Sequence, residues 1–257
     1  MKFTVITLFP DLIEAWAKTG LIGTAIKKNL LEIEIINPRQ FTSDVHHSVD
    51  DKAFGGSDGM VLKFEPLATA IESAGDAHVA FLSPQGKVWD QAHAESWSVN
   101  QKHVVLVCGR YAGFDQRLIE AHADEEISVG DYILNGGEVA SLSVMESVAR
   151  LIPGVLGNQI SSENESFRDG LLESPAFTRP REVNGMSVPS PLLSGNHAKI
   201  ARFERDVSLF RTRLLRPDLF KSDLEEEFRA AHGRLKLLPV GELSALGITS
   251  DQMGRFE

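Results

Sequence analysis

Cysteine is almost absent from this chain of 257 residues: Cys108 stands alone, so an intrachain disulfide is excluded. We expect Cys108 to be a small core residue because it ends an apolar stretch. Long apolar runs are absent too, and none approaches the roughly 20 residues that a membrane-spanning helix needs. The N-terminal stretch MKFTVITLFPD lacks the small-residue cleavage pattern of a signal peptide. These absences predict a cytoplasmic protein without a membrane partner.

Positive charge is scarce as well. Lysine and arginine number 26 against 36 aspartates and glutamates, which gives a formal net charge of −10 at pH 7. Non-specific binding to nucleic acids depends on clustered cations, so this balance argues against a protein that binds nucleic acids non-specifically. Any nucleic-acid binding has to come from local basic segments. The Gly-x-Gly-x-x-Gly and Walker A motifs are both missing, which argues against a Rossmann dehydrogenase and a P-loop NTPase.

Short apolar runs alternate with helical patterns in the N-terminal part of the chain. We expect strands over residues 3–9, 31–36, 78–83, 103–108 and 125–129, and helices over 11–29, 65–74, 90–99, 114–122 and 137–150. This order predicts an α/β fold, with a parallel sheet and helices on both of its faces. The polar stretch 157–170 is typical of a linker, and the chain beyond it is proline-rich to Pro191 and then helical. The sequence therefore predicts a first domain over 1–158, a linker over 159–172 and a small helical domain over 173–257.

Three glycine-containing loops each follow an expected strand, at residues 82–86, 108–113 and 129–138. Ligands of open α/β sheets bind at the carboxyl ends of the strands. Glycine lets a backbone approach a ligand closely, and loop N–H and C=O groups can then bind an adenine edge or ribose hydroxyls. Any one of these loops is typical of an ordinary turn, whereas three in succession favour a nucleoside ligand bound mainly by backbone.

Seven segments, in this order, resemble the bacterial tRNA (guanine-N1)-methyltransferase family TrmD, of the SPOUT class, from residue 1 to about residue 220. They are LFPD, VDDKAFGGSDGMV, LSPQG, VLVCGRYAGFDQR, SVGDYILNGGE, RLIPGVLGN and LLSGNHAKI. The resemblance implies a deep trefoil knot in the sheet domain and methylation of N1 of the guanosine just 3′ of the tRNA anticodon. It also implies S-adenosyl-L-methionine as cofactor and a homodimer whose subunits share the active site.

The resemblance places the cofactor in the three loops. Carried over by motif, the cofactor-binding residues are Leu82, Ser83, Pro84, Gln85, Gly86, Gly109, Arg110, Tyr111, Gly113, Gly130, Tyr132, Leu134, Gly136 and Gly137.

The chemistry requires a base for the N1 proton and a cation near the guanine carbonyl oxygen, where negative charge develops. Arg150 occupies the position of the family's catalytic arginine. Glu165 stands where the family has a catalytic aspartate, and its carboxylate reaches one methylene further. Asp169 is the alternative base, because it would share a face with Glu165 if the linker became helical on binding RNA.

The sequence departs from the family near the expected site. Ala112 replaces the glutamate of the usual Gly-Arg-Tyr-Glu-Gly, which weakens the case for a bound Mg²⁺ ion, and Ser57 and Asp58 stand where smaller or apolar residues are usual. No metal ligands are assigned, and His46 and His47 are interpreted as loop residues. Two alternatives to the tRNA enzyme stay open: a SPOUT methyltransferase acting on another RNA, and a non-catalytic RNA-binding relative.

A local basic segment supports binding to tRNA. Residues 197–216 could form one helix that begins after Asn196 and ends before Pro217. In such a helix five cations fall within an arc of roughly 120°, which Leu209 interrupts, and an apolar arc lies beside it. We expect the cations to contact phosphates, and Arg179 and Arg181 to extend the stripe. This basic stripe comprises Lys199, Arg202, Arg205, Arg213 and Arg216.

Overall fold

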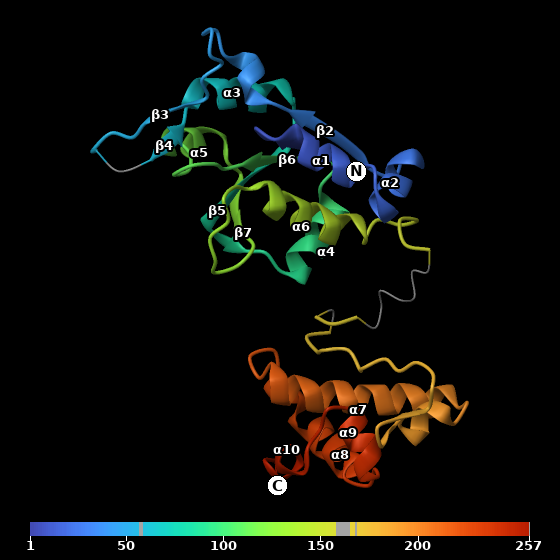
Figure 1. The fold of residues 1–257 in the computed structure, drawn as a ribbon. Helices are drawn as coiled ribbons and strands as arrows, with labels where there is room; N and C mark the ends of the chain where they lie inside the picture. The colour runs from blue at the N-terminus through green and yellow to red at the C-terminus, as the bar shows by residue number, and fades with distance from the viewer. Residues whose placement is uncertain (57–58, 158–164, 168, 257) are drawn as a thin grey trace. The chain divides into compact units, whose positions relative to one another are not determined.

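The computed structural model describes residues 1–56, 59–157, 165–167 and 169–256 (Figure 1). The chain forms two compact units, Met1–Gln159 and Ile160–Glu257, each with its own hydrophobic core. None of the helices in the described part of the chain combines the length and apolarity that crossing a bilayer requires.

A five-stranded parallel sheet, in the order β2-β1-β6-β5-β7, forms the centre of the first unit. Its strands are β1 (Lys2–Ile6), β2 (Glu32–Ile36), β5 (His78–Val88), β6 (His103–Cys108) and β7 (Glu125–Ser128). The expected α/β class with a parallel sheet is confirmed. A small antiparallel hairpin of β3 (Asp50–Lys52) and β4 (Met60–Leu62) stands apart from this sheet.

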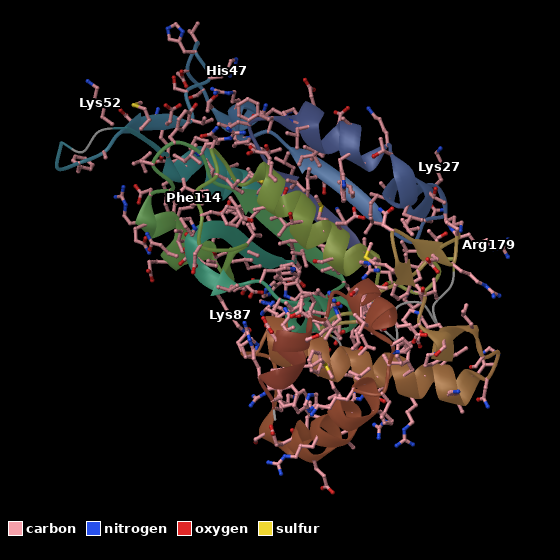
Figure 2. The ribbon with its side chains drawn as sticks, turned by 60° about the horizontal axis from the view of Figure 1, so that its bottom comes forward. Lys27, His47, Lys52, Lys87, Phe114 and Arg179 are labelled. Carbon is pink, nitrogen blue, oxygen red and sulfur yellow. The ribbon has the colours of Figure 1, made fainter. Side chains whose placement is uncertain are left out.

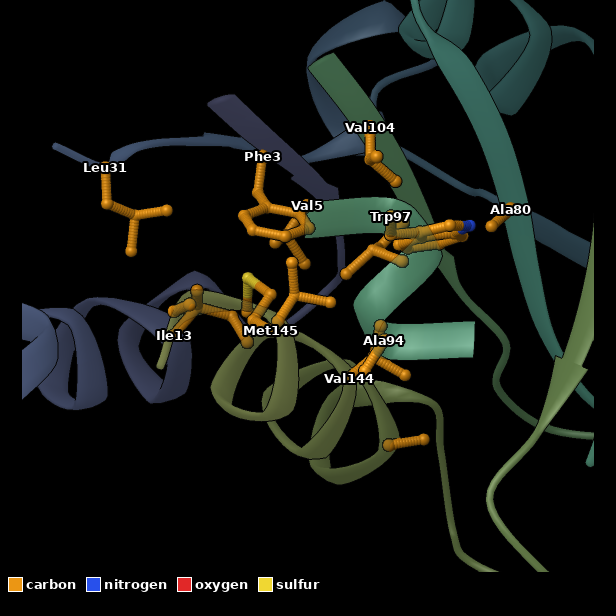
Figure 3. Close-up of a cluster of buried hydrophobic side chains, with 14 of the residues drawn as sticks. Phe3, Val5, Ile13, Leu31, Ala80, Ala94, Trp97, Val104, Val144 and Met145 are labelled. Atoms are coloured by element: carbon orange, nitrogen blue, oxygen red, sulfur yellow. The ribbon is translucent and has the colours of Figure 1, made fainter. Parts of the chain in front are cut away.

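Helices cover both faces of the sheet, as predicted. They are α1 (Pro10–Ala17), α2 (Gly20–Lys27), α3 (Phe64–Ser73), α4 (Gln91–Asn100), α5 (Gln116–His122) and α6 (Glu138–Ala149), with the short 3₁₀ helix η1 (Pro38–Phe41). Side chains of β6 alternate between the two cores, as the two-residue period of a strand requires: Val104 and Leu106 pack under α1, α2, α4 and α6, and Val105 under α3 and α5. Figure 3 shows the first of these cores, to which Phe3 of β1 and Met145 of α6 both belong.

The helical stretch expected near residues 11–29 forms two helices, α1 and α2, with a break between them. Gly20 has a φ of 56°, in the left-handed region that glycine enters without steric cost, and the chain turns at this point between α1 and α2.

The first glycine-containing segment is a bulge inside a strand and not a terminal loop. Leu82 and Lys87 of β5 both pair with Ile127 of β7, so residues 83–86 loop out between two paired stretches of the same strand. A Cβ on Gly86 would lie 2.4 Å from the backbone carbon of Glu126, so only glycine lets the bulge return to the sheet. The expected strand end near residue 83 is therefore wrong.

The second unit contains a short hairpin followed by helices. Its elements are β8 (Glu182–Val183), β9 (Met186–Ser187), η3 (Ser190–Leu193), α7 (His197–Leu215), η4 (Ser222–Leu224), α8 (Glu225–Leu235), α9 (Val240–Ala245) and α10 (Ser250–Gly254). The helix α7 matches the expected one: the side chain of Asn196 caps it by accepting a hydrogen bond from the Lys199 amide at 3.1 Å. Leu209 was expected to interrupt the basic face, but it is fully buried with Phe210 in the core against α8.

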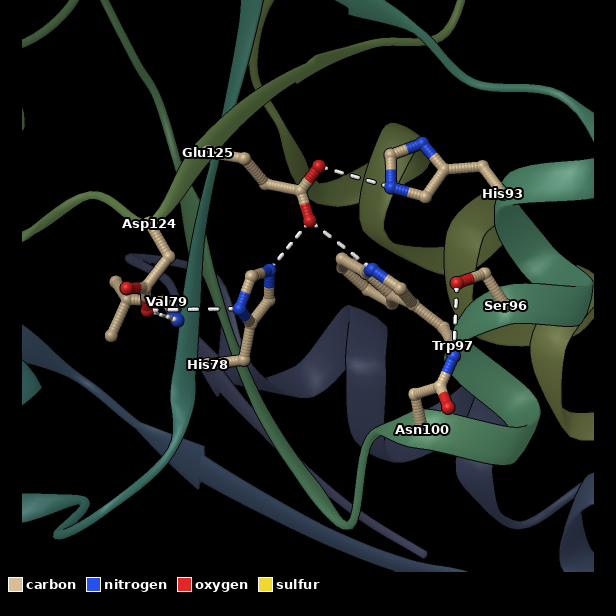
Figure 4. A network of polar contacts seen from close by, with 8 residues as sticks. All are labelled: His78, Val79, His93, Ser96, Trp97, Asn100, Asp124 and Glu125. Atoms are coloured by element: carbon tan, nitrogen blue, oxygen red, sulfur yellow. Dashed lines mark hydrogen bonds and ion pairs between the residues drawn. The ribbon is translucent and has the colours of Figure 1, made fainter.

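A polar network joins β5, α4 and the start of β7 (Figure 4). Glu125 contacts His78 at 2.5 Å and His93 at 3.0 Å, and it accepts a hydrogen bond from the Trp97 indole at 3.1 Å. The hydrogen bond to Glu125 raises the pKa of His78, against the opposing effect of burial, and the nearby Asp124 adds to the rise. Burial pushes the pKa of Glu125 upward, but its partners outweigh burial and leave that pKa lowered.

These shifts predict a pH dependence of stability. Because folding raises the pKa of His78, its protonated form stabilises the folded unit fully below the unfolded-state pKa of about 6.5, and this contribution is lost as pH rises through the folded-state pKa. We expect the difference in unfolding free energy between wild type and His78→Gln to shrink from about pH 6 to about pH 8, measured by urea denaturation. The variant His46→Gln, in an exposed loop, is the control; a difference for His78→Gln that grew with pH would contradict the prediction.

Candidate active site

The carboxyl ends of β5, β6 and β7 meet at one edge of the sheet, and a cavity of about 340 Å³ opens there. This volume lies within the range of small-molecule sites in proteins. Every residue carried over as cofactor-binding lines this one cavity, apart from Gly86: Leu82, Ser83, Pro84, Gln85, Gly109, Arg110, Tyr111, Gly113, Gly130, Tyr132, Leu134, Gly136 and Gly137. The structure thus brings together segments that are far apart in the sequence.

Further lining residues come from positions that sequence reasoning missed. Asn135 and Ile133 lie inside the third glycine-containing segment and could have been included with it. Gln116 and Ile119 lie in α5 and Glu126 lies in β7, where the sequence carries no signal that separates them from ordinary helix and strand residues.

Backbone hydrogen bonds hold the segment that follows β6. The Ala112 amide donates to the Met60 carbonyl and the Leu62 amide donates to the Gly113 carbonyl, both at 2.9 Å, so β4 supports this segment from outside the main sheet. Tyr111 has a φ of 57° and Gly113 a φ of 110°, which makes the turn tight. Its shape is therefore determined by the hairpin as well as by its own residues.

An ion pair ties the second lining segment to the third. The guanidinium of Arg110 lies 2.9 Å from the carboxylate of Glu138, donates to the Asn135 carbonyl at 3.3 Å, and lies 4.1 Å from the ring centre of Phe9. Glu138 also accepts a hydrogen bond from the Thr7 hydroxyl at 2.8 Å, and it is 1% exposed at the start of α6. Arg110 lines the cavity, but its charge is engaged by Glu138.

The thiol of Cys108 is buried beneath this ion pair. Burial raises the pKa of Cys108, which leaves the thiol protonated and unreactive at neutral pH. The expectation that Cys108 is a core residue is confirmed.

Comparison with known proteins identifies the family. The family model described as tRNA (Guanine-1)-methyltransferase TrmD matches residues 1–222. The chain belongs to this family. The protein named tRNA (guanine-N(1)-)-methyltransferase from Pectobacterium carotovorum subsp. carotovorum (strain PC1) is 50% identical over 227 residues, covering 86% of this chain and 90% of that protein. Proteins of the same name from Shewanella frigidimarina (strain NCIMB 400) and Pasteurella multocida (strain Pm70) are 48% and 47% identical, cover 86% of this chain, and are themselves covered to 91% and 92%.

The residues that the TrmD motifs suggest for catalysis lie in different units. Arg150 caps the C-terminus of α6 in the first unit and does not line the cavity formed by the described residues. Glu165 is half-buried and Asp169 is exposed, and both belong to the second unit. Phe167, between them, has a φ of 78°, which is not helical. Ser57 and Asp58, like linker positions 158–164 and 168, lie outside the described residues.

Most cations of the basic stripe have acidic neighbours within their own unit. Glu227 binds Arg205 through two hydrogen bonds of 3.0 Å. Arg213 lies 3.9 Å from Glu225, and Arg216 lies 2.7 Å from Asp218.

Lys199 and Arg202 are exposed, and among the described residues neither has an ion-pair partner. Arg179 and Arg181 are exposed and lie just before the β8–β9 hairpin, and Figure 2 shows Arg179 extending from the ribbon. His46 and His47 lie in an exposed loop, as expected, and Figure 2 shows the position of His47.

The approach of Gly137 to the end of β6 generates a stability prediction. A Cβ on Gly137 would lie 2.8 Å from the Cα of Cys108, which is backbone and cannot move aside. A Cβ on Gly109 would lie 3.1 Å from the Phe114 ring and 3.4 Å from the Leu82 carbonyl oxygen, so its backbone contact is at an ordinary distance. Gly137 has an ordinary φ of −77°, which alanine adopts without strain, so the substitution tests the close contact with Cys108 and not the backbone conformation. We expect Gly137→Ala to lower the unfolding free energy by about 1–3 kcal/mol in urea denaturation, and Gly109→Ala to lower it less. Equal losses would show that backbone proximity is not the deciding factor.

Proposed function

We propose that the protein transfers a methyl group from S-adenosyl-L-methionine to N1 of the guanosine just 3′ of the tRNA anticodon. The observation that carries the proposal is the convergence of the three motif segments on one cavity, in a chain whose relatives are named tRNA (guanine-N(1)-)-methyltransferase. Tyrosine rings and glycine backbone along the cavity are groups that suit a nucleoside ligand, with Tyr111 and Tyr132 each about half exposed.

The proposal includes a deep trefoil knot at the carboxyl edge of the sheet. One observation supports the knot: β7 pairs with β5, although β6 is the strand that comes directly before β7 in the chain. The segments associated with all three strands also enclose the same cavity. Threaded chains are rare, and a strand order alone does not require one. The family to which the chain belongs is the further support.

The residues present fit the cofactor. Gly113 has open space where a side chain would lie, and the neighbouring backbone groups line the cavity. When bound, S-adenosyl-L-methionine supplies an activated methyl group, so the protein has to align the guanine and remove its N1 proton. Ala112 brings no carboxylate to the site, and the proposal contains no Mg²⁺ ion in the reaction.

Arg150 and Glu165 are proposed as the catalytic residues. Glu165 takes the N1 proton onto a carboxylate oxygen, and Arg150 stabilises the negative charge that then develops on the guanine carbonyl oxygen. Asp169 is the weaker candidate for the base, because this residue is exposed to solvent. The half-buried position of Glu165 supports its assignment.

tRNA and a second copy of the chain are the proposed partners, and tRNA as substrate supports a cytoplasmic location. The proposed homodimer shares its active site between subunits. Its support is the exposure of apolar side chains beside the cavity, since Ile133 is 83% exposed and Val139 is 52% exposed.

Methyl transfer from labelled S-adenosyl-L-methionine tests the function. tRNA transcripts with guanosine 3′ of the anticodon should be methylated, and transcripts with adenosine there should not. Methylation of a ribosomal RNA fragment in place of tRNA would favour the alternative that the protein is a SPOUT methyltransferase acting on another RNA. Cofactor and tRNA binding without methylation would favour the non-catalytic relative.

Glu165→Gln should lower the single-turnover rate of methyl transfer by about 10²- to 10⁴-fold, the usual loss when a positioned base is removed. Binding of cofactor and tRNA, measured by calorimetry and filter binding, should be retained. Asp169→Asn is the matched control and should stay active. An inactive Asp169→Asn beside an active Glu165→Gln would move the base assignment to Asp169.

Lys199→Gln combined with Arg202→Gln should weaken tRNA binding and reduce its salt dependence, because these cations are proposed to contact phosphates. Each lost phosphate contact reduces the slope of log K against log salt by roughly one. Arg205→Gln is the control and should have a smaller effect, since Glu227 already binds that guanidinium. If the slope of log K against log salt is unchanged in the double variant, these cations do not contact phosphates and α7 is an ordinary amphipathic helix.

A further inference from the structure

Two neighbouring carboxylates at the start of β7 have different surroundings. Successive side chains of a strand point to opposite faces of its sheet. Glu125 points to the face covered by α4, where it accepts the hydrogen bond from Trp97 (Figure 4). Glu126 therefore belongs to the face covered by α5, whose Gln116 and Ile119 line the cavity together with it.

The charges along the cavity wall do not cancel. Among the described residues that line the cavity, Arg110 is the one cation and Glu126 the one anion. The charge of Arg110 is balanced by Glu138, which is buried behind the wall and does not line the cavity. Glu126 is half-buried, and within the described part of the chain it forms no ion pair. Glu126 therefore contributes the one charge among the described lining residues that has no ion-pair partner in the described part of the chain.

We propose that Glu126 makes the cavity prefer a cationic ligand over a neutral one of the same shape. The proposal rests on the proposed function. S-adenosyl-L-methionine carries a fixed positive charge on its sulfonium sulfur, and S-adenosyl-L-homocysteine, which remains after the methyl group has left, has a neutral thioether there. A carboxylate without a protein partner attracts the first and gains little from the second.

This preference has a consequence for turnover. Both forms of the cofactor share the adenosine and the amino-acid groups, so backbone contacts to these parts bind both equally well. Only a group that responds to the charge on sulfur distinguishes them. Glu126 is a specificity-determining residue that favours replacement of the used cofactor by a fresh one.

The test compares dissociation constants for S-adenosyl-L-methionine and S-adenosyl-L-homocysteine by calorimetry, in wild type and in Glu126→Gln. Glutamine keeps the size of the side chain and removes its charge. We expect the affinity for S-adenosyl-L-methionine to fall about 3- to 10-fold, the size of one partly exposed charge interaction, and the affinity for S-adenosyl-L-homocysteine to stay within about twofold.

Glu125→Gln is the matched control, since it removes the adjacent carboxylate of the same strand from the opposite face. Both dissociation constants should be unchanged in it. Equal losses for the two ligands in Glu126→Gln, or none, would overturn the proposal while leaving the proposed function intact. Wild-type protein that binds neither ligand would instead overturn the proposed function.

A measurement on wild type keeps the proposal testable if Glu126→Gln does not fold. Salt screens charge interactions at exposed and partly exposed sites. The affinity for S-adenosyl-L-methionine should therefore fall between about 0.05 M and about 0.5 M salt by more than the affinity for S-adenosyl-L-homocysteine. Parallel curves for the two ligands would count against a charged determinant in the cavity.

Discussion

The parallel pairing of β5 with both β6 and β7 is the constraint on which the candidate site depends. In this register Leu82 lies beside Cys108 on one side and Ile127 on the other. Strands that run in one direction and are aligned in this way bring the segments that follow β6 and β7 to the same edge, where the bulge of β5 at residues 83–86 also lies. Apolar side chains on both faces of β6 fix that register, because a slip of one residue would exchange the two faces.

Close packing at that edge leaves little freedom in the shape of the cavity. The Gly137 amide donates a backbone hydrogen bond to the Gly109 carbonyl at 2.9 Å. The two segments that contain these residues approach each other too closely for a Cβ at Gly137. Arg110 and Glu138 join the same segments through their side chains. A buried ion pair gains little net stability after desolvation, but breaking it leaves a buried charge without a partner. The pair is better understood as holding one arrangement of the segments than as a large source of stability.

Much of this architecture follows from patterns that the sequence displays openly. After His103, the run from Val104 to Cys108 is apolar, which is typical of a strand buried on both faces, and the bounds of β6 were predicted correctly. The bulge in β5 could not be predicted, because it depends on Ile127 pairing twice, and Ile127 belongs to β7, which follows α4, β6 and α5 in the chain. Glu126 and Glu138 were missed for a related reason. The role of Glu126 depends on which face of β7 is covered and by what, and alternation in the sequence does not say which face that is. Glu138 begins α6, and its role depends on the approach of Arg110 from another segment.

The charge distribution of the second unit bears on how an acidic protein can hold tRNA. Phosphates must compete with Glu227 for Arg205 and with Asp218 for Arg216, and each of these ion pairs holds its guanidinium in a defined position. Paired arginines gain less from a new anion than unpaired ones, since an existing partner has to be displaced or shared. Lys199 and Arg202, in the first turns of α7, carry no such cost. On the proposal that α7 contacts tRNA phosphates, the attraction is strongest at the N-terminal end of the helix, and this asymmetry would orient the RNA along α7.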